Sequence, residues 1–283
     1  MKRKIMILTI AFLSSVLMCA NVFAAASGRC GDSITWTLDD SGNLTLSGSG
    51  ELIDKGFGDD GFKNYGIKTA TIEDGITSIE KYAFEGCTGM TKLTLPNSLV
   101  SIGSGAFQGC SGLTELTLPN SITSIGVGVF QGCSGMTELT LPNSVTRIGE
   151  SAFSGCSGLT ELTLPSSVTR IGNSAFEGCS GLTELTLPNS VMSIGRSAFG
   201  GCSGLTELTL PNSVTSIGGY AFAYCSGLSK ITSLAEIPPV CGYGVFDGVN
   251  KTNCELIVPK GSVAAYKQAY GWNGFSNIRG FSE

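Results

Sequence analysis

Residues 112–134 run Gly-Leu-Thr-Glu-Leu-Thr-Leu-Pro-Asn-Ser-Ile-Thr-Ser-Ile-Gly-Val-Gly-Val-Phe-Gln-Gly-Cys-Ser. Close copies of this unit of 23 residues follow one another from residue 89 to residue 226. Seven cysteines keep the same spacing: Cys87, Cys110, Cys133, Cys156, Cys179, Cys202 and Cys225. Seven phenylalanines do so as well: Phe84, Phe107, Phe130, Phe153, Phe176, Phe199 and Phe222. Self-similarity at a fixed short period predicts a solenoid of stacked coils.

One coil can be built from the unit itself. Residues 116–118 alternate apolar and polar side chains, which predicts a short strand with one buried face, and Pro119 ends it. Ile122 and Ile125 are expected to point inward from a second extended stretch, and Phe130 to fill the coil. A single unit cannot bury its apolar face, so stacking must build the core. The predicted fold is a mostly β solenoid with little α/β character, a right-handed superhelix of about eight coils.

The two ends of the chain differ from the repeats. Residues 1–24 carry a basic start and an apolar stretch, which is typical of an export signal. A solenoid needs caps, because its terminal coils would otherwise expose apolar faces. The predicted division is an export signal (1–24), an N-terminal β-hairpin cap (25–65), the solenoid (66–250, with near-identical units at 89–226) and a C-terminal strand-helix cap (251–283). In the C-terminal cap, Ser262 is expected to cap a short helix that has Val263, Tyr266 and Tyr270 on one face.

The repeat resembles those of a known family. The order L-x-x-L-x-L-P-x-S-V-x-x-I-G-x-x-A-F-x-G-C is similar to the BspA-type leucine-rich repeats of bacterial surface and secreted proteins. Residues 30–48 resemble the leader of such proteins, and residues 256–275 resemble their usual ending. The resemblance implies an adhesin or interaction module, often on the cell surface and often binding host or matrix proteins. Resemblance to such a family predicts the fold of this chain better than it predicts the ligand.

Composition excludes several classes of function. The chain has no histidine, which removes His-based catalytic triads, His-ligated zinc sites and imidazole switches. The formal charge is −5 and no basic run follows the first few residues, so nucleic acid is not an expected partner. No apolar segment of spanning length follows residue 24. We expect a secreted, extracellular and bacterial monomer, with any attachment to the cell surface left open.

A charged row precedes the first strand of successive units. It consists of Lys92, Glu115, Glu138, Glu161, Glu184, Glu207 and Lys230. Strand alternation places this row outward, beside a row of threonines: Thr117, Thr140, Thr163 and Thr186. Together these residues form the predicted binding stripe. Neighbouring carboxylates also occur in retaining glycosidases, and carboxylate oxygens suit calcium, but a flat repeated row offers neither a cleft nor a loop cage. A solvated contact surface is the favoured interpretation, with no metal and no cofactor.

Cysteines and tyrosines supply the remaining candidates. Stacked cysteines at one constant spacing favour a buried apolar column over a metal site, because metal-ligating cysteines usually occur in close pairs. Cys241 and Cys254 lie outside the column and are candidates for a disulfide. Tyr220, Tyr224 and Tyr243 gather near the last coils. They could stack on a sugar or contact a protein, but packing under the C-terminal cap is the favoured interpretation.

The sequence therefore predicts an interaction protein. Its partner would be an extracellular protein or glycan, such as a host matrix component, bound through the solenoid surface. The alternatives are a carbohydrate-active enzyme that uses the carboxylates and a structural surface component without a discrete ligand. Missing histidines and the uniform strand face favour a protein that is not an enzyme.

Overall fold

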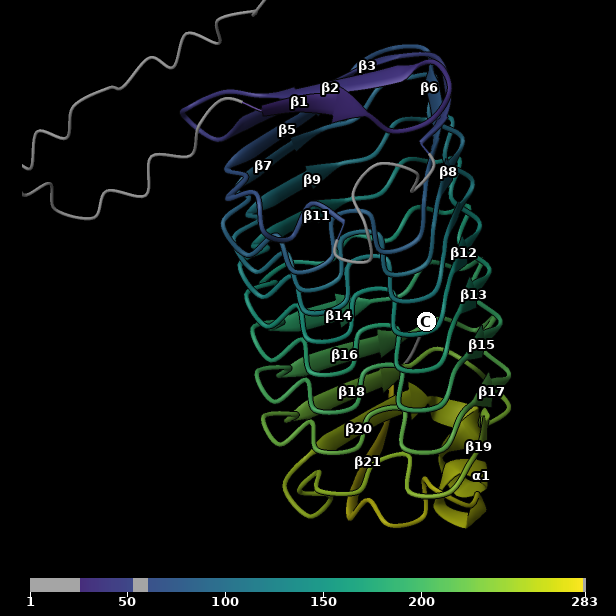
Figure 1. The fold of residues 1–283 in the computed structure, drawn as a ribbon. Helices are drawn as coiled ribbons and strands as arrows, with labels where there is room; N and C mark the ends of the chain where they lie inside the picture. The colour runs from purple at the N-terminus through teal and green to yellow at the C-terminus, as the bar shows by residue number, and fades with distance from the viewer. Residues whose placement is uncertain (1–25, 53–60, 282–283) are drawn as a thin grey trace, which may run out of the picture.

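The computed structural model describes residues 26–52 and 61–281, which form a solenoid of about ten turns (Figure 1). The predicted export signal lies outside these residues. The prediction of a mostly β solenoid is confirmed, and α1 (Val263–Gln268) is a single short α-helix near the C-terminal end. The predicted coils and the two predicted caps together make up these turns. The leader and the C-terminal segment add strands to the same parallel ladder, because β3 (Asn43–Gly48) pairs with β5 (Thr69–Ile72) and β18 (Lys230–Ser233) pairs with β20 (Glu255–Pro259).

All turns but one contribute a strand to the long-strand side of the solenoid, which is the side that carries the predicted stripe (Figure 1). The exception among the described turns is the one at residues 161–163, which forms only an isolated bridge. In addition to the four strands just named, this side contains β7 (Lys92–Thr94), β9 (Glu115–Thr117), β11 (Glu138–Thr140), β14 (Glu184–Thr186), β16 (Glu207–Leu210) and β21 (Asn277–Phe281). At the N-terminal end, β1 (Ala26–Arg29) and β2 (Ile34–Leu38) pair antiparallel and join the sheet through β3. Successive side chains of a strand are exposed, buried and exposed, as at Glu115, Leu116 and Thr117. The central apolar residue therefore faces the core.

A second ladder forms the short-strand side. It consists of β4 (Gly50–Leu52), β6 (Ile76–Ile79), β8 (Ser101–Ile102), β10 (Ser124–Ile125), β12 (Arg147–Ile148), β13 (Arg170–Ile171), β15 (Ser193–Ile194), β17 (Ser216–Ile217) and β19 (Val240–Cys241). Its isoleucines are buried, as at Ile148 and Ile171, which pair directly. Serines just before these strands donate hydrogen bonds to carbonyl groups of the preceding coil. Ser144 Oγ, for example, donates to Ile122 O at 2.6 Å.

Tight turns form the third side of each coil and also stack on one another. The Gly132 amide donates to Ser154 O at 2.7 Å, and the same bond recurs in neighbouring coils. Gly132 has φ +73°, a left-handed conformation that strains other L residues. Because this position recurs in every unit, glycine is retained there through most of the array.

The core is built on a continuous stack of phenylalanine rings. Eight neighbouring pairs from Phe62 to Phe246 lie 5.0–5.8 Å apart between ring centroids and within 20° of parallel. Trp36 contacts Phe62 at one end, and Trp272 contacts Phe246 at the other. The two tryptophans therefore end the stack and cover its outermost rings.

The C-terminal cap packs differently from the prediction. Tyr266 is fully buried, and its hydroxyl bonds to Ser233 Oγ at 2.7 Å and Ala235 O at 2.9 Å. Ser262 occupies the N-cap position of α1, as predicted, but its side chain makes no capping hydrogen bond. Tyr270 is not on the buried face, because 60% of its surface is exposed. It follows the end of α1, where the backbone has left the helix.

Candidate binding surface

The predicted stripe lies on the long-strand side as one exposed row. Parallel pairing sets Glu115 beside Glu138, and Glu184 beside Glu207, with no offset in register. Lys92, Glu161 and the four glutamates just named are exposed, and Lys230 is half-buried. Thr117, Thr140, Thr163 and Thr186 form the exposed row next to them. One charged side chain and one hydroxyl therefore repeat at every coil over this region.

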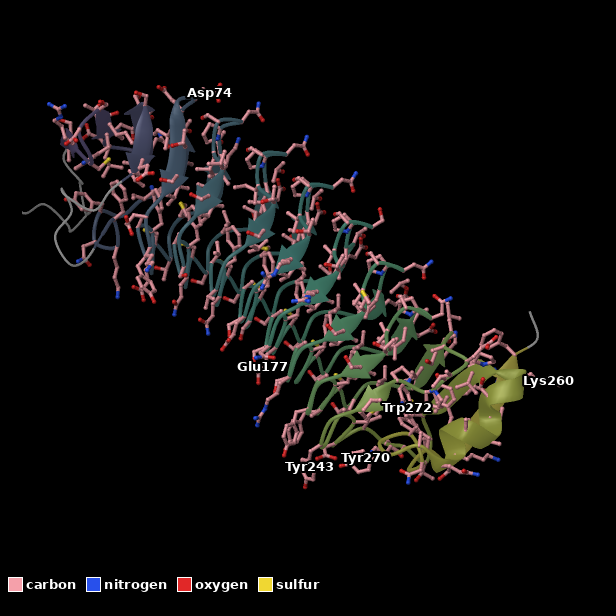
Figure 2. The ribbon with its side chains drawn as sticks, turned by 90° about the vertical axis from the view of Figure 1, so that its right-hand side faces the viewer. Asp74, Glu177, Tyr243, Lys260, Tyr270 and Trp272 are labelled. Carbon is pink, nitrogen blue, oxygen red and sulfur yellow. The ribbon has the colours of Figure 1, made fainter. Side chains whose placement is uncertain are left out.

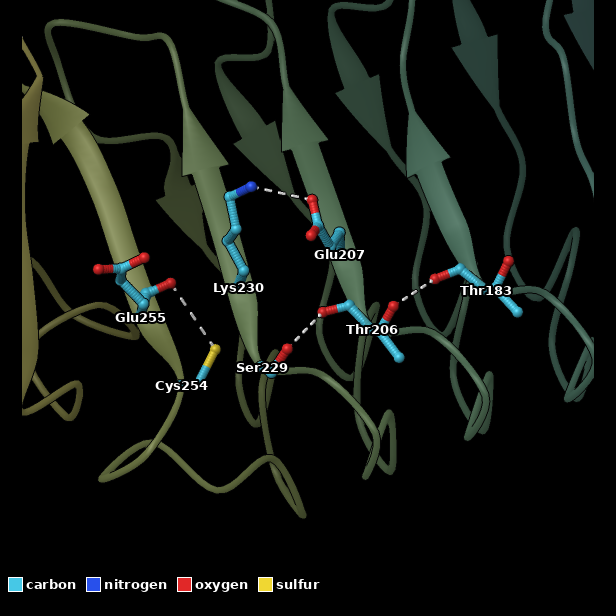
Figure 3. A network of polar contacts seen from close by, with 7 residues as sticks. All are labelled: Thr183, Thr206, Glu207, Ser229, Lys230, Cys254 and Glu255. Atoms are coloured by element: carbon cyan, nitrogen blue, oxygen red, sulfur yellow. Dashed lines mark hydrogen bonds and ion pairs between the residues drawn. The ribbon is translucent and has the colours of Figure 1, made fainter.

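Near the C-terminal end the row changes from one sign of charge to alternating signs. Lys230 Nζ lies 3.0 Å from Glu207 Oε2, as Figure 3 shows. Lys230 is also paired in register with Glu255, and Glu255 forms an ion pair with Arg279. That ion pair holds the pKa of the Glu255 carboxyl below its ordinary value. The sequence analysis missed Glu255 and Arg279. Glu255 could have been found, since it precedes Leu-Ile-Val as the other glutamates precede Leu-Thr-Leu.

Hydroxyls just before several strands of the stripe bond to the preceding coil. Thr206 Oγ1 donates to Thr183 O at 3.0 Å, and Ser229 Oγ donates to Thr206 O at 3.2 Å (Figure 3). Both bonds run between adjacent coils. The stripe therefore sits on a backbone whose spacing is held by side chains as well as by the β ladder.

The ladder under the stripe has two interruptions among the described strands. No backbone pairing joins β7 to β9, and residues 161–163 keep only a single bridge, from Thr163 to Thr140. Shallow hollows occur at both places. One of about 520 Å³ is lined by residues of β7 and β9, including Lys92 and Glu115. The other, of about 340 Å³, is lined by Glu138, Glu161 and both neighbouring threonines. The stripe is therefore not flat, as the sequence suggested, but hollowed at two points.

The tyrosines are not packed under the C-terminal cap, and that interpretation is wrong. Tyr224 and Tyr243 are each 68% exposed, and Tyr220 is half-buried. The Tyr220 and Tyr243 rings meet edge to face, with centroids 5.5 Å apart. Trp272 and Phe275 fill the cap instead, so the tyrosines are left on the outside.

The cysteine column is buried as predicted. From Cys110 to Cys225, each Sγ donates to a phenylalanine carbonyl of the preceding coil at 3.1–3.4 Å. Burial raises the pKa of the Cys87, Cys133 and Cys225 thiols to about 12. These thiols are therefore neutral side chains of the core.

The predicted Cys241–Cys254 disulfide is not formed, because both residues are free thiols in the structure. Cys241 belongs to β19 on the short-strand side, whereas Cys254 directly precedes β20 on the long-strand side. Their Sγ atoms contact different carbonyls, Pro239 O at 3.7 Å and Glu255 O at 3.9 Å. Burial raises the pKa of both thiols, to about 12 for Cys241 and about 11 for Cys254.

Residues 26–52 and 61–281 contain neither a cluster of metal-ligating side chains nor a helix that could span a membrane. Within these ranges, no three side chains among His, Cys, Asp and Glu converge to hold a metal ion. None of the helices in the described part of the chain is long and apolar enough to cross a membrane. The predictions that the protein holds no cofactor and is not an enzyme stay predictions.

Solved structures with the same architecture come from several bacteria. A leucine-rich repeat protein of Bacteroides ovatus is 24% identical over 89% of this chain and 76% of its own, with a TM-score of 0.53. A leucine rich cell surface protein of Faecalibacterium prausnitzii is 21% identical over 91% and 95%, with a TM-score of 0.52. The leucine-rich repeat protein of T. pallidum is 26% identical over 75% and 90%, with a TM-score of 0.53. No match was found among curated proteins.

The repeats themselves identify the family. The family described as BspA type Leucine rich repeat region matches residues 55–183 and 146–256, in six copies. These ranges span most of the array and agree with the stacked coils of the fold. The chain belongs to the BspA-type leucine-rich repeat family.

Proposed function

We propose that the protein is an extracellular, adhesin-like interaction module that binds a protein partner through the stripe. The observation that carries this proposal is the coincidence of the stripe with the two hollows. At both hollows, charged and hydroxyl side chains surround a depression where the strand ladder opens. Polar groups that converge on a depression can fix the orientation of a bound group.

The sign of the stripe indicates the chemistry of the partner. Glu115 lies directly opposite Glu138, and Glu184 directly opposite Glu207, and like charges directly opposed on neighbouring strands destabilise a sheet. A basic surface on a partner, rich in lysine or arginine, would relieve this repulsion and gain affinity from it. We therefore propose a basic protein surface, such as one on a host matrix protein, as the ligand.

Export and surface location belong to the same proposal. Residues 1–24 have the character of an export signal, and one structural relative is described as a cell surface protein. We also propose that residues 1–24 form the export signal, residues 25–65 the N-terminal cap, residues 66–250 the solenoid and residues 251–283 the C-terminal cap. It assigns no catalytic role to the carboxylates.

The test is binding to an array of extracellular matrix proteins at low and physiological salt. Glu138→Gln with Glu161→Gln removes two charges from one hollow and keeps their shape. The matched control, Glu150→Gln with Glu177→Gln, removes two exposed charges elsewhere. We expect the first variant to lose affinity, most strongly at low salt, and the control to keep it. Equal affinity of both variants and the native protein would contradict the proposal.

A further inference from the structure

Two exposed arginines lie in register on the short-strand side and are here called the arginine pair: Arg147 of β12 and Arg170 of β13. Their strands belong to adjacent coils, which are about 4.8 Å apart. Figure 2 shows the solenoid with this side turned towards the viewer. The other near-identical units carry serine at this position: Ser101, Ser124, Ser193 and Ser216. The arginine pair is therefore a local departure from the repeat.

The arginine pair has no ion-pair partner in the described part of the chain. The ion pairs there join Lys230 to Glu207 and Arg279 to Glu255. Like charges directly opposed on neighbouring strands destabilise a sheet, a cost that serine avoids in the adjacent coils. Since no described carboxylate pairs with the two guanidinium groups, an anionic surface placed on them would relieve their repulsion.

A fitting partner presents negative groups at the spacing of the coils. A guanidinium group binds a carboxylate through two parallel hydrogen bonds, so two of them one coil apart match two carboxylates one coil apart. The stripe has this arrangement, because Glu115 pairs in register with Glu138, and Glu184 with Glu207. The stripe of a second copy of this chain therefore fits the arginine pair in charge and in spacing.

The two surfaces also occur at nearly the same level along the solenoid axis. Arg147 follows Glu138 by nine residues, and Arg170 follows Glu161 by nine residues. Nine residues are less than half of a unit of 23, so two copies with parallel axes need only a small axial shift to bring these side chains together. Glu138 and Glu161 line the hollow of about 340 Å³, which leaves room for the arginine side chains.

The same placement continues beyond the arginine pair. Serines follow glutamates of the stripe by nine residues in three further coils, as Ser124 follows Glu115, Ser193 follows Glu184 and Ser216 follows Glu207. A serine hydroxyl can donate a hydrogen bond to a carboxylate. Each glutamate of one copy would thus face a hydrogen-bond donor of the next copy, with the arginine pair at the centre of the contact.

We propose that the protein associates side by side with a second copy, with the arginine pair of one molecule bound to Glu138 and Glu161 of the next. Figure 1 shows the two surfaces on different sides of the solenoid, so both remain available in each molecule and the contact can repeat. The proposal rests on the stripe being a contact surface, as the proposed function does, and names a second copy as a basic partner. Exposed ion pairs contribute little each, so the association is weak and salt-dependent. The monomer expected from the sequence is then the form at low protein concentration.

Sedimentation velocity of the purified protein over a range of concentrations tests this association. We expect the average mass to rise with concentration at physiological salt and to stay that of a monomer at about 1 M salt, where exposed charges are screened. Arg147→Ser with Arg170→Ser introduces the serine of the adjacent coils, so the fold is retained. This variant should raise the dissociation constant for self-association about tenfold, and Glu138→Gln with Glu161→Gln should do the same.

A mixture of the two variants gives the sharpest result. One variant keeps only the stripe and the other keeps only the arginine pair, so an equimolar mixture should form heterodimers that do not grow further. The two variants change the net charge in opposite directions, so a loss of self-association in both is not an effect of net charge.

Glu150→Gln with Glu177→Gln is the matched control. It removes two negative charges, as Glu138→Gln with Glu161→Gln does, but outside the proposed contact. Figure 2 shows Glu177 at the edge of the solenoid that the turns form. This control should self-associate as the native protein does.

Self-association and matrix binding can fail independently. Arg147→Ser with Arg170→Ser keeps the stripe, so it should bind matrix proteins as the native protein does. Loss of matrix binding by the native protein, with self-association intact, would contradict the proposed function alone.

Four results would overturn the proposed association. The first is a native protein that stays monomeric at every concentration. The second is a mixture of the two variants that forms no heterodimer, and the third is an equal loss of self-association in the Glu150→Gln with Glu177→Gln control. The fourth is a monomeric native protein that binds dextran sulfate through Arg147 and Arg170, which would make the arginine pair a site for an external polyanion.

Discussion

Many residue positions of this protein recur in every coil, so that one residue type forms a column along the solenoid. Cys133 is one small buried thiol, but the same position is a buried cysteine in every coil from Cys87 to Cys225. Any effect of one buried thiol on stability is therefore repeated along the core. The position was predictable, because a constant spacing forces its side chains into one column. The sides of the coil on which Cys241 and Cys254 lie were not predictable. Both residues lie outside the repeat, and their spacing does not indicate which side each one occupies.

The buried thiols predict a loss of stability at alkaline pH. Burial raises the pKa of Cys133 from 9.0 to about 12, so the folded state keeps a proton that the unfolded chain releases in this range. This contribution is complete below pH 9 and is lost as pH rises towards 12. In urea titrations over this range, Cys133→Ala should reduce the pH slope of the unfolding free energy by about one proton. An unchanged slope would contradict the burial of the thiol.

Accessibility of the thiols gives an independent check. The native protein should react slowly with a thiol reagent, and the denatured protein should release all ten described cysteines for reaction. Rapid labelling of the column without denaturant would show that these residues are not in the core.

Two glycines of one unit should differ in their cost of substitution. Gly178 has φ +73°, but a Cβ there would meet no atom within 3.7 Å, so Gly178→Ala should cost about 1–2 kcal/mol of backbone strain. A Cβ on Gly172 would lie 2.7 Å from the carbonyl carbon of Gly149, so Gly172→Ala must displace backbone and should cost more than about 3 kcal/mol. Chemical denaturation measures both values. The reverse order would contradict the stacking of the turns.

At the scale of elements, identical sequences do not form identical strands. Residues 161–163 and 184–186 are both Glu-Leu-Thr, but only the second segment is a strand paired with a neighbour along its length. A strand of three residues makes few hydrogen bonds, so its pairing depends on the spacing of adjacent coils rather than on its own residues. The sequence could therefore predict the stripe but not the hollows in it.

Hydrogen exchange tests these interruptions directly. Amides at residues 161–163 should exchange faster than those of β16 and β18, because fewer of them are held by a neighbouring strand. Mass spectrometry of peptides from each coil resolves the difference. Uniform protection along the long-strand side would mean that the ladder is continuous and the hollows are closed.

The architecture of the whole molecule results from the stacking of each coil on its neighbours between two caps. The period predicts the coils, the buried columns and the outward stripe, because stacking leaves each side chain only one environment. The period does not determine the ends. There the tyrosines are amphipathic, and their exposure depends on how Trp272 and Phe275 fill the cap.

Deletion of one whole unit tests the central claim most directly. Because each coil contacts only its neighbours, a chain that lacks residues 158–180 should fold cooperatively and be shorter by one coil, about 4.8 Å, in small-angle X-ray scattering. A chain that lacks only residues 158–167 loses less sequence but breaks the register of every buried column, and it should unfold at a much lower temperature. Equal tolerance of the two deletions, or the collapse of both, would contradict a solenoid of interchangeable coils.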